Sequence, residues 1–139
     1  MGKVDENKKQ KKLALLNTAY ELFTTKGINS TAISDIVKQA GVAKGTFYLY
    51  FKDKYDIRNK LIEKTSKRLF SDAISALNKV YIDNFDDQVI FIINHVIDSL
   101  TNDKILLKFM TFGHFLFWDI AISVLLVIII NMRWIKWVK

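Results

Sequence analysis

The stretch GVAKGTFYLYF, residues 41–51, joins a glycine to a short aromatic run and decides the fold. Glycine at position 41 favours the end of one helix, and KGTFYLY favours the start of another. The aromatic side chains are predicted to divide between two faces. We expect Phe47 and Phe51 in the core and Tyr48 on the outside, while the pattern leaves the side of Tyr50 open.

Amphipathic helices are predicted on the N-terminal side of this stretch. Apolar residues at steps of three and four indicate a helix over residues 9–26, ended by Gly27. A second helix is expected over residues 32–40, with Ser30 or Thr31 as its N-cap. Because only a tight turn with a glycine separates this helix from the aromatic one, the pair has the helix-turn-helix arrangement.

Helical periodicity continues on the C-terminal side. Asp53 is expected to cap a fourth helix, with Asp56 in a weak capping box, and the apolar period runs to about residue 80. Residues 83–87 mark a connection. The apolar stripe from Val89 to Leu100 then favours a fifth helix over a strand. The sequence therefore predicts an all-α fold.

Composition excludes several kinds of chemistry. The 139 residues include no cysteine, which excludes disulfides and thiol chemistry, and the absence of proline suits continuous helices. No paired carboxylates or Ser-His-Asp set is visible. His95 and His114 stand alone on apolar stretches, where a core or pocket-lining histidine is commoner than a metal ligand. We therefore expect no enzyme activity, no cofactor and no metal site.

Positive charge is concentrated in the first half of the chain. Residues 1–60 contain 12 Lys or Arg and 6 Asp or Glu, whereas residues 61–139 contain 9 and 8. This excess indicates an anionic partner, nucleic acid or a membrane surface, or else a basic solvated surface. The expected first helical turn carries Lys8, Lys9, Lys11 and Lys12. Cations there oppose the helix dipole unless a negatively charged partner is present.

Residues 24–57, TTKGINSTAISDIVKQAGVAKGTFYLYFKDKYDI, resemble the DNA-binding domain of the TetR/AcrR family of bacterial transcriptional regulators. The matching features are the glycine after the first helix, the threonine that opens the second, AGV at its end, KGTFYLYF as the recognition helix, and a lysine at the start of the fourth helix. The resemblance covers about residues 9–70. It implies double-stranded DNA as the partner.

The resemblance also implies which residues bind DNA. Thr31 would bind a phosphate through its hydroxyl and backbone N–H, Ala32 belongs to the same helix start, and Lys54 would bind a phosphate at the start of the fourth helix. In the recognition helix the implied residues are Lys44, Gly45, Thr46, Tyr48 and Tyr50. General physics agrees, because helix N-termini bind phosphate and lysines supply a salt-dependent affinity.

The resemblance and the composition together divide the chain into four parts. We expect a flexible arm over residues 1–8, the DNA-binding domain over 9–70, a partial helical regulatory or dimerisation region over 71–108, and an apolar segment over 109–139. In the family, the helices after the fourth bind a small ligand and dimerise. A truncated or altered form of that region is therefore expected here.

The apolar segment has three interpretations. Between Phe109 and Met132 only Asp119 is charged, and this length spans a bilayer. The segment is a buried or dimer-forming helix, a membrane anchor, or an out-of-frame extension. We favour the out-of-frame extension over the dimer helix because the composition changes abruptly after Lys108.

The resemblance implies a cytoplasmic, homodimeric transcriptional regulator that binds a pseudo-palindromic operator with sequence specificity. By the family default it would be a repressor, and a small-molecule inducer would control it. The alternative is a helix-turn-helix scaffold that attaches to a membrane or a partner protein and has lost DNA regulation through C-terminal truncation. Salt-dependent binding of duplex DNA distinguishes the two.

Overall fold

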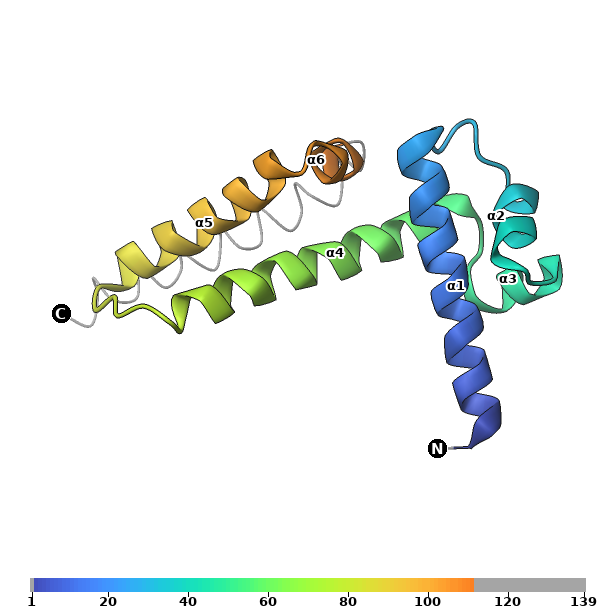
Figure 1. The fold of residues 1–139 in the computed structure, drawn as a ribbon, viewed down its shortest axis with the longest axis horizontal. Coiled ribbons are helices and arrows are strands. Elements are labelled where there is room, and N and C mark those ends of the chain that lie inside the picture. Colours follow the sequence, from blue (N-terminus) through green and yellow to red (C-terminus); the bar gives the residue numbers. More distant parts are fainter. Residues whose placement is uncertain (1, 112–139) are drawn as a thin grey trace. The chain divides into compact units, whose positions relative to one another are not determined.

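The computed structural model describes residues 2–111, which form six α-helices and contain no strand (Figure 1). This result confirms the predicted all-α fold. The chain divides into two compact units, residues 1–63 and the residues from Lys64 onward. The first unit contains α1 (Lys3–Thr25), α2 (Ile33–Ala40), α3 (Lys44–Tyr50) and the start of α4 (Lys54–Leu77).

The second unit contains the rest of α4, then α5 (Phe85–Asn102) and α6 (Lys104–Thr111). The side chain of Asn84 caps α5 by accepting a hydrogen bond from the Asp86 N–H at 3.0 Å. Asp103 separates α5 from α6, and its Oδ1 accepts from the Leu106 N–H at 2.9 Å. The fifth helix is thus confirmed, and the break at Asp103 is a feature that the periodicity did not predict.

None of the helices in residues 2–111 is long and apolar enough to cross a bilayer. The three interpretations of the apolar segment concern mainly residues 112–139, and these residues lie outside the part of the chain that the structure describes.

Helix α1 begins earlier than expected. Its N-cap is Gly2, so residues 3–8 are helical and do not form the flexible arm that we predicted. Asp5 and Glu6 occupy the first turn, where negative charge interacts favourably with the helix dipole, and Glu6 accepts a hydrogen bond from Gln10 at 3.2 Å. The four lysines of residues 8–12 therefore lie in the second and third turns. The predicted conflict with the dipole was wrong because the helix start was misplaced.

The core of the first unit lies among α1, α2, α3 and the start of α4. Phe47 and Phe51 are buried as predicted, and their ring centroids are 5.5 Å apart. The other buried apolar side chains are Leu15, Leu16, Ala19, Phe23, Ile36, Val37, Ile57, Leu61 and Ile62. Burying an aromatic ring of α3 in this core fixes the position of the short helix.

A glycine turn joins α2 to α3. Gly41 has a φ of +69°, in the left-handed region that glycine adopts without strain. The Val42 N–H donates to the Val37 carbonyl at 3.0 Å, and the Gly41 N–H donates to the Lys38 carbonyl at 3.3 Å. These two bonds form a Schellman motif, which satisfies the last carbonyls of α2 and redirects the chain into α3.

Replacing Gly41 with alanine should lower the free energy of unfolding by about 1 to 2 kcal/mol, because an L side chain is strained at this φ. Gly45→Ala is the matched control. A Cβ meets nothing within 4 Å at either position, and only Gly45 is helical. Alanine at position 45 should raise stability by about 0.5 to 1 kcal/mol. Urea unfolding measures the stability of both variants. Equal changes in stability would contradict the explanation that the left-handed φ of Gly41 disfavours an L side chain.

The start of α2 is held by a carboxylate from its own first turn. The N-cap is Ala32, and not Ser30 or Thr31 as predicted. Asp35 Oδ2 accepts hydrogen bonds from Lys26 Nζ at 2.8 Å and from the Ala32 N–H at 3.1 Å. These bonds, first that of Lys26 and then that of the Ala32 N–H, hold the pKa of Asp35 below its ordinary value of 3.8. The carboxylate thereby links the end of α1 to the start of α2.

This link should depend on pH. Because folding lowers the pKa of Asp35, its contribution to stability is present above about pH 4 and is lost as the pH falls through the folded pKa. We expect Asp35→Asn to lower the Tm near pH 7 and to have a much smaller effect at a pH well below 3.8. Asp72→Asn, at an exposed position of α4, is the control and should shift the Tm little at either pH.

Candidate nucleic-acid interface

An open depression of about 380 Å³ lies on the first unit. Its walls come from the start of α2, from α3 and from the start of α4. The lining residues are Thr31, Ala32, Ile33, Ser34, Lys44, Tyr48, Asp53, Lys54 and Tyr55. Five of the eight predicted DNA-binding residues therefore meet here, whereas Gly45, Thr46 and Tyr50 lie outside the depression.

The N-terminal end of α2 forms one wall. The first N–H groups of an α-helix have no acceptor within the helix, so those of Ile33 and Ser34 are available to an external group. Ser34 is also exposed and adds a hydroxyl at the same place. Such a helix end attracts anions, phosphate in particular. The carboxylate of Asp35 does not compete, because Lys26 and Ala32 occupy it.

The polar groups of Thr31 make hydrogen bonds within the chain. It is 1% exposed, and its hydroxyl donates a hydrogen bond to the Gly27 carbonyl at 2.7 Å. Its backbone N–H donates to the Ile28 carbonyl at 3.3 Å. Both groups that we expected to bind a phosphate are thus used within the chain. They close the loop between α1 and α2 and bring Ala32 to the start of α2.

Lys54 also faces inward, toward the same loop. Its ammonium group lies 2.9 Å from the carbonyl oxygen of Ile28, 3.1 Å from that of Thr31 and 3.4 Å from that of Asn29. A lysine has three N–H donors, so these three carbonyls account for all of them. The side chain therefore clamps the loop that precedes α2, and does not present a free cation to a phosphate as expected.

Removing this clamp should destabilise the domain. Lys54→Met keeps most of the alkyl chain but leaves three carbonyls without their donor, and we expect a loss of about 1 to 2 kcal/mol for a partly exposed charged group. Lys52→Met is the control, since that side chain is exposed and should matter by less than about 0.5 kcal/mol. Urea unfolding gives both values. Equal stability of the two variants would show that the clamp contributes nothing.

Asp53 caps α4 as predicted. Its Oδ1 accepts from the N–H groups of Tyr55 and Asp56, each at 2.8 Å. Asp56 Oδ2 in turn accepts from the Lys52 N–H at 2.9 Å, one residue before the N-cap. These bonds fix the start of α4 and with it the position of Lys54.

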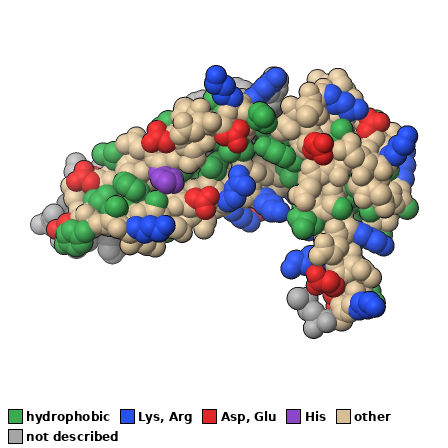
Figure 2. All heavy atoms as spheres, in the orientation of Figure 1, with side chains coloured by type: hydrophobic (Ala, Val, Ile, Leu, Met, Phe, Trp, Pro, Cys, Tyr) green, Lys and Arg blue, Asp and Glu red, His purple; other side chains and the backbone are tan. Residues whose placement is uncertain are grey.

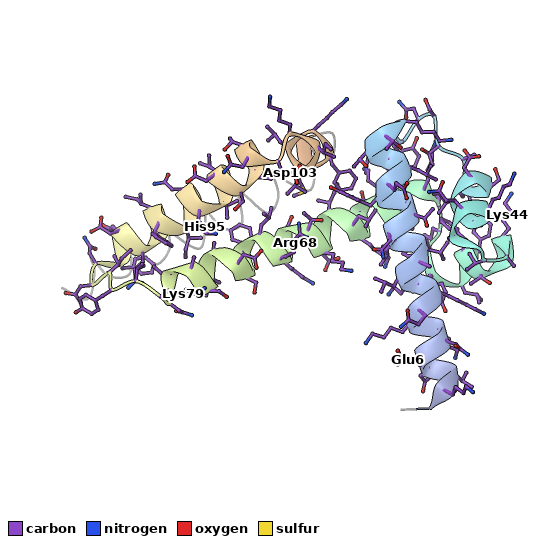
Figure 3. All side chains as sticks on the ribbon, viewed as in Figure 1. Glu6, Lys44, Arg68, Lys79, His95 and Asp103 are labelled. Carbon is purple, nitrogen blue, oxygen red and sulfur yellow. The ribbon has the colours of Figure 1, made fainter. Side chains whose placement is uncertain are left out.

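The outer face of α3 is defined here as Lys44, Gly45, Tyr48 and Leu49. All four residues are exposed, and Figure 3 shows Lys44 on the side of the unit away from α1. Tyr48 is 52% exposed, as predicted, and its ring meets buried Phe47 edge-on with centroids 5.4 Å apart. A Cβ on Gly45 would meet open space, so another molecule can approach the backbone closely there.

Leu49 is a functional candidate that the sequence analysis missed. It is 78% exposed, although it is a large apolar residue in the middle of the aromatic stretch. Its position four residues after Gly45 and two after Phe47 is the signal that places it on the outer face. Thr46 is half-buried, and Tyr50 donates its hydroxyl to the Lys8 carbonyl at 3.2 Å, so neither is a free surface group.

A short exposed helix that follows another helix across a glycine turn, with both packed on a common core, defines a helix-turn-helix domain. The sequence profile of bacterial regulatory proteins of the tetR family matches residues 15–61, which include α2 and α3. The part of the chain that contains the helix-turn-helix is therefore similar to the N-terminal domain of TetR-family regulators.

Three curated proteins illustrate the relationship. The chain is 41% identical over 63 residues to the uncharacterized HTH-type transcriptional regulator YvdT of Bacillus subtilis, a match covering 45% of this chain and 30% of that protein. It is 41% identical over 59 residues to the fatty acid metabolism regulator protein of Bacillus subtilis, covering 42% and 30%. It is 37% identical over 49 residues to the HTH-type transcriptional repressor BepR of Brucella suis, covering 35% and 23%.

Solved structures give the same result over a longer region. The fatty acid degradation regulator FadR from Bacillus halodurans is 27% identical with a TM-score of 0.56, over 69% of this chain and 50% of that chain. A TetR family transcription regulator from Shewanella sp. PV-4 is 27% identical with a TM-score of 0.58, over 71% and 52%. The chain spans less than a third of these curated relatives and about half of these solved structures.

Proposed function

We propose that this chain is a transcriptional regulator that binds double-stranded DNA with sequence specificity. The observation that carries the proposal is the division of α3 into two faces. Phe47 and Phe51 anchor the helix in the core, while Lys44, Tyr48 and Leu49 project outward. A helix held in this way can enter the major groove without disturbing the core.

We assign two kinds of contact to this surface. The N–H groups at the start of α2, the Ser34 hydroxyl and the Tyr48 hydroxyl bind phosphates, and Lys44 adds a charge that makes affinity depend on salt. Gly45 and Leu49 face the base edges. Because thymine presents a methyl group in the major groove, the apolar Leu49 favours a thymine at one position of each half-site.

The remaining predicted residues act indirectly. Lys54 and Thr31 hold the loop before α2, so they position the phosphate-binding N–H groups without touching the DNA. Ala32 contributes the N-cap position, and half-buried Thr46 lies between the two faces of α3. In this proposal, some residues bind the DNA directly, and others hold the DNA-binding groups in place.

The regulator acts as a cytoplasmic homodimer and represses transcription in this proposal. Two copies of α3 would read half-sites of a pseudo-palindrome about 34–36 Å apart, one helical turn of DNA. The similarity to the repressor BepR over the DNA-binding region supports repression. A small-molecule inducer would act through residues beyond the DNA-binding domain, as the family resemblance implies.

Selection of bound duplexes from a random pool tests this function. The full-length chain should enrich a pseudo-palindrome and bind it with an affinity that falls steeply with salt. Tyr48→Phe keeps the ring but removes the hydroxyl, and it should weaken binding to all sequences alike. Leu49→Ala should cost about fivefold in affinity and relax the preference at one position per half-site.

Two outcomes would contradict the proposal at different levels. Absence of binding to any duplex at low salt would exclude a DNA-binding regulator of this type. Enrichment of an unchanged sequence by Leu49→Ala would exclude the assigned base contact while leaving the general function intact.

A further inference from the structure

The N-terminal part of α1 carries a basic face that the recognition helix does not explain. The packed face of α1 contains Leu15, Leu16 and Ala19. Lys12 and Lys8 lie four and eight residues before Leu16, so helical periodicity places them on the same face. On this face of α1, the buried apolar residues are therefore preceded by lysines. Figure 2 shows basic side chains at this end of α1, together with the acidic side chains of its first turn.

A hydrogen bond places this basic face beside α3. The Tyr50 hydroxyl donates to the backbone carbonyl of Lys8 at 3.2 Å, across 42 residues of sequence. The ring of Tyr50 lies 6.3 Å from that of buried Phe51 between centroids. One side chain thus joins the end of the recognition helix, the core and the basic turn of α1. The two surfaces are parts of the same unit.

The charges on this face are available. Lys8 and Lys12 are exposed, and the ion pairs found in residues 2–111 do not involve either of them. Of the two acids nearby, Glu6 accepts a hydrogen bond from Gln10, and Asp5 lies in the first turn at the helix start. Because residues 8–12 lie inside α1, the backbone positions of the two lysines are held at fixed spacing, which lowers the entropy lost on binding.

We propose that Lys8 and Lys12 bind the DNA phosphate backbone next to the site read by α3. This inference rests on the proposed function and extends it to a second contact surface. Lysines at i and i+4 lie one turn apart on the helix, and each ammonium group meets a phosphate as a point charge. The contacts add affinity and salt dependence but carry no sequence information.

The test compares two double variants of the full-length chain on duplex DNA of random sequence. Lys8→Gln/Lys12→Gln removes the basic face. Lys60→Gln/Lys64→Gln removes two exposed lysines with the same spacing on α4. We expect the first variant to reduce the slope of log affinity against log salt by about 1.8, since each neutralised phosphate contributes about 0.9. The control should keep the wild-type slope.

The outcomes show whether the proposed function or only this inference fails. If wild type binds no DNA, the proposed function fails. If wild type binds with a steep slope that Lys8→Gln/Lys12→Gln leaves unchanged, or that both double variants reduce equally, only the basic-face contact is overturned. A slope that stays the same while binding to phosphatidylserine-containing vesicles disappears would overturn it in favour of a membrane surface.

Tyr50→Phe tests the placement of the basic face. This variant keeps the half-buried ring beside Phe51 but removes the bond to the Lys8 carbonyl. We expect faster amide hydrogen exchange at residues 8–12 and a salt slope between those of wild type and Lys8→Gln/Lys12→Gln. Exchange and slope identical to wild type would show that the hydroxyl does not position the lysines.

Discussion

The ammonium group of Lys54 organises the side of the first unit that we propose faces DNA. It gathers three carbonyls of residues 28–31, which lie more than twenty positions away in sequence. The Thr31 hydroxyl closes the same loop onto Gly27. The start of α2 is fixed by these bonds and by Asp35, so its free N–H groups face outward in one position. An anion site built from backbone N–H groups requires such a fixed frame, because those groups cannot move independently.

A second constraint is the short length of α3. Seven residues cannot form a stable helix alone, so tertiary packing must hold them. Phe47 supplies that packing from one face, and the Gly41 turn sets the direction of entry. Everything opposite Phe47 is then exposed, including Leu49. The exposed apolar residue is thus a consequence of the same anchoring that buries the aromatic one, and it becomes favourable only against an apolar group of a partner.

The elements that could be predicted from sequence are those encoded locally. Apolar periodicity gave the helices of the first unit, and Asp53 and Gly41 marked a helix start and a turn. The prediction was wrong where a tertiary contact or a local cap decided the outcome. The start of α1 depends on Asp5, Glu6 and a glycine cap, and the inward direction of Lys54 depends on a loop far away in sequence. Periodicity contains neither kind of information.

Residue type alone therefore does not tell which lysines of this domain can bind an anion and which hold a loop in place. Lys54 satisfies three carbonyls, and a phosphate could reach it only by replacing one of them, which would loosen the loop that presents the start of α2. Lys44 and Lys8 have no such internal acceptors among the described residues and remain available to an anion. In the proposed function, the affinity for DNA depends on Lys44 and Lys8, whereas the rigidity of the binding surface depends on Lys54.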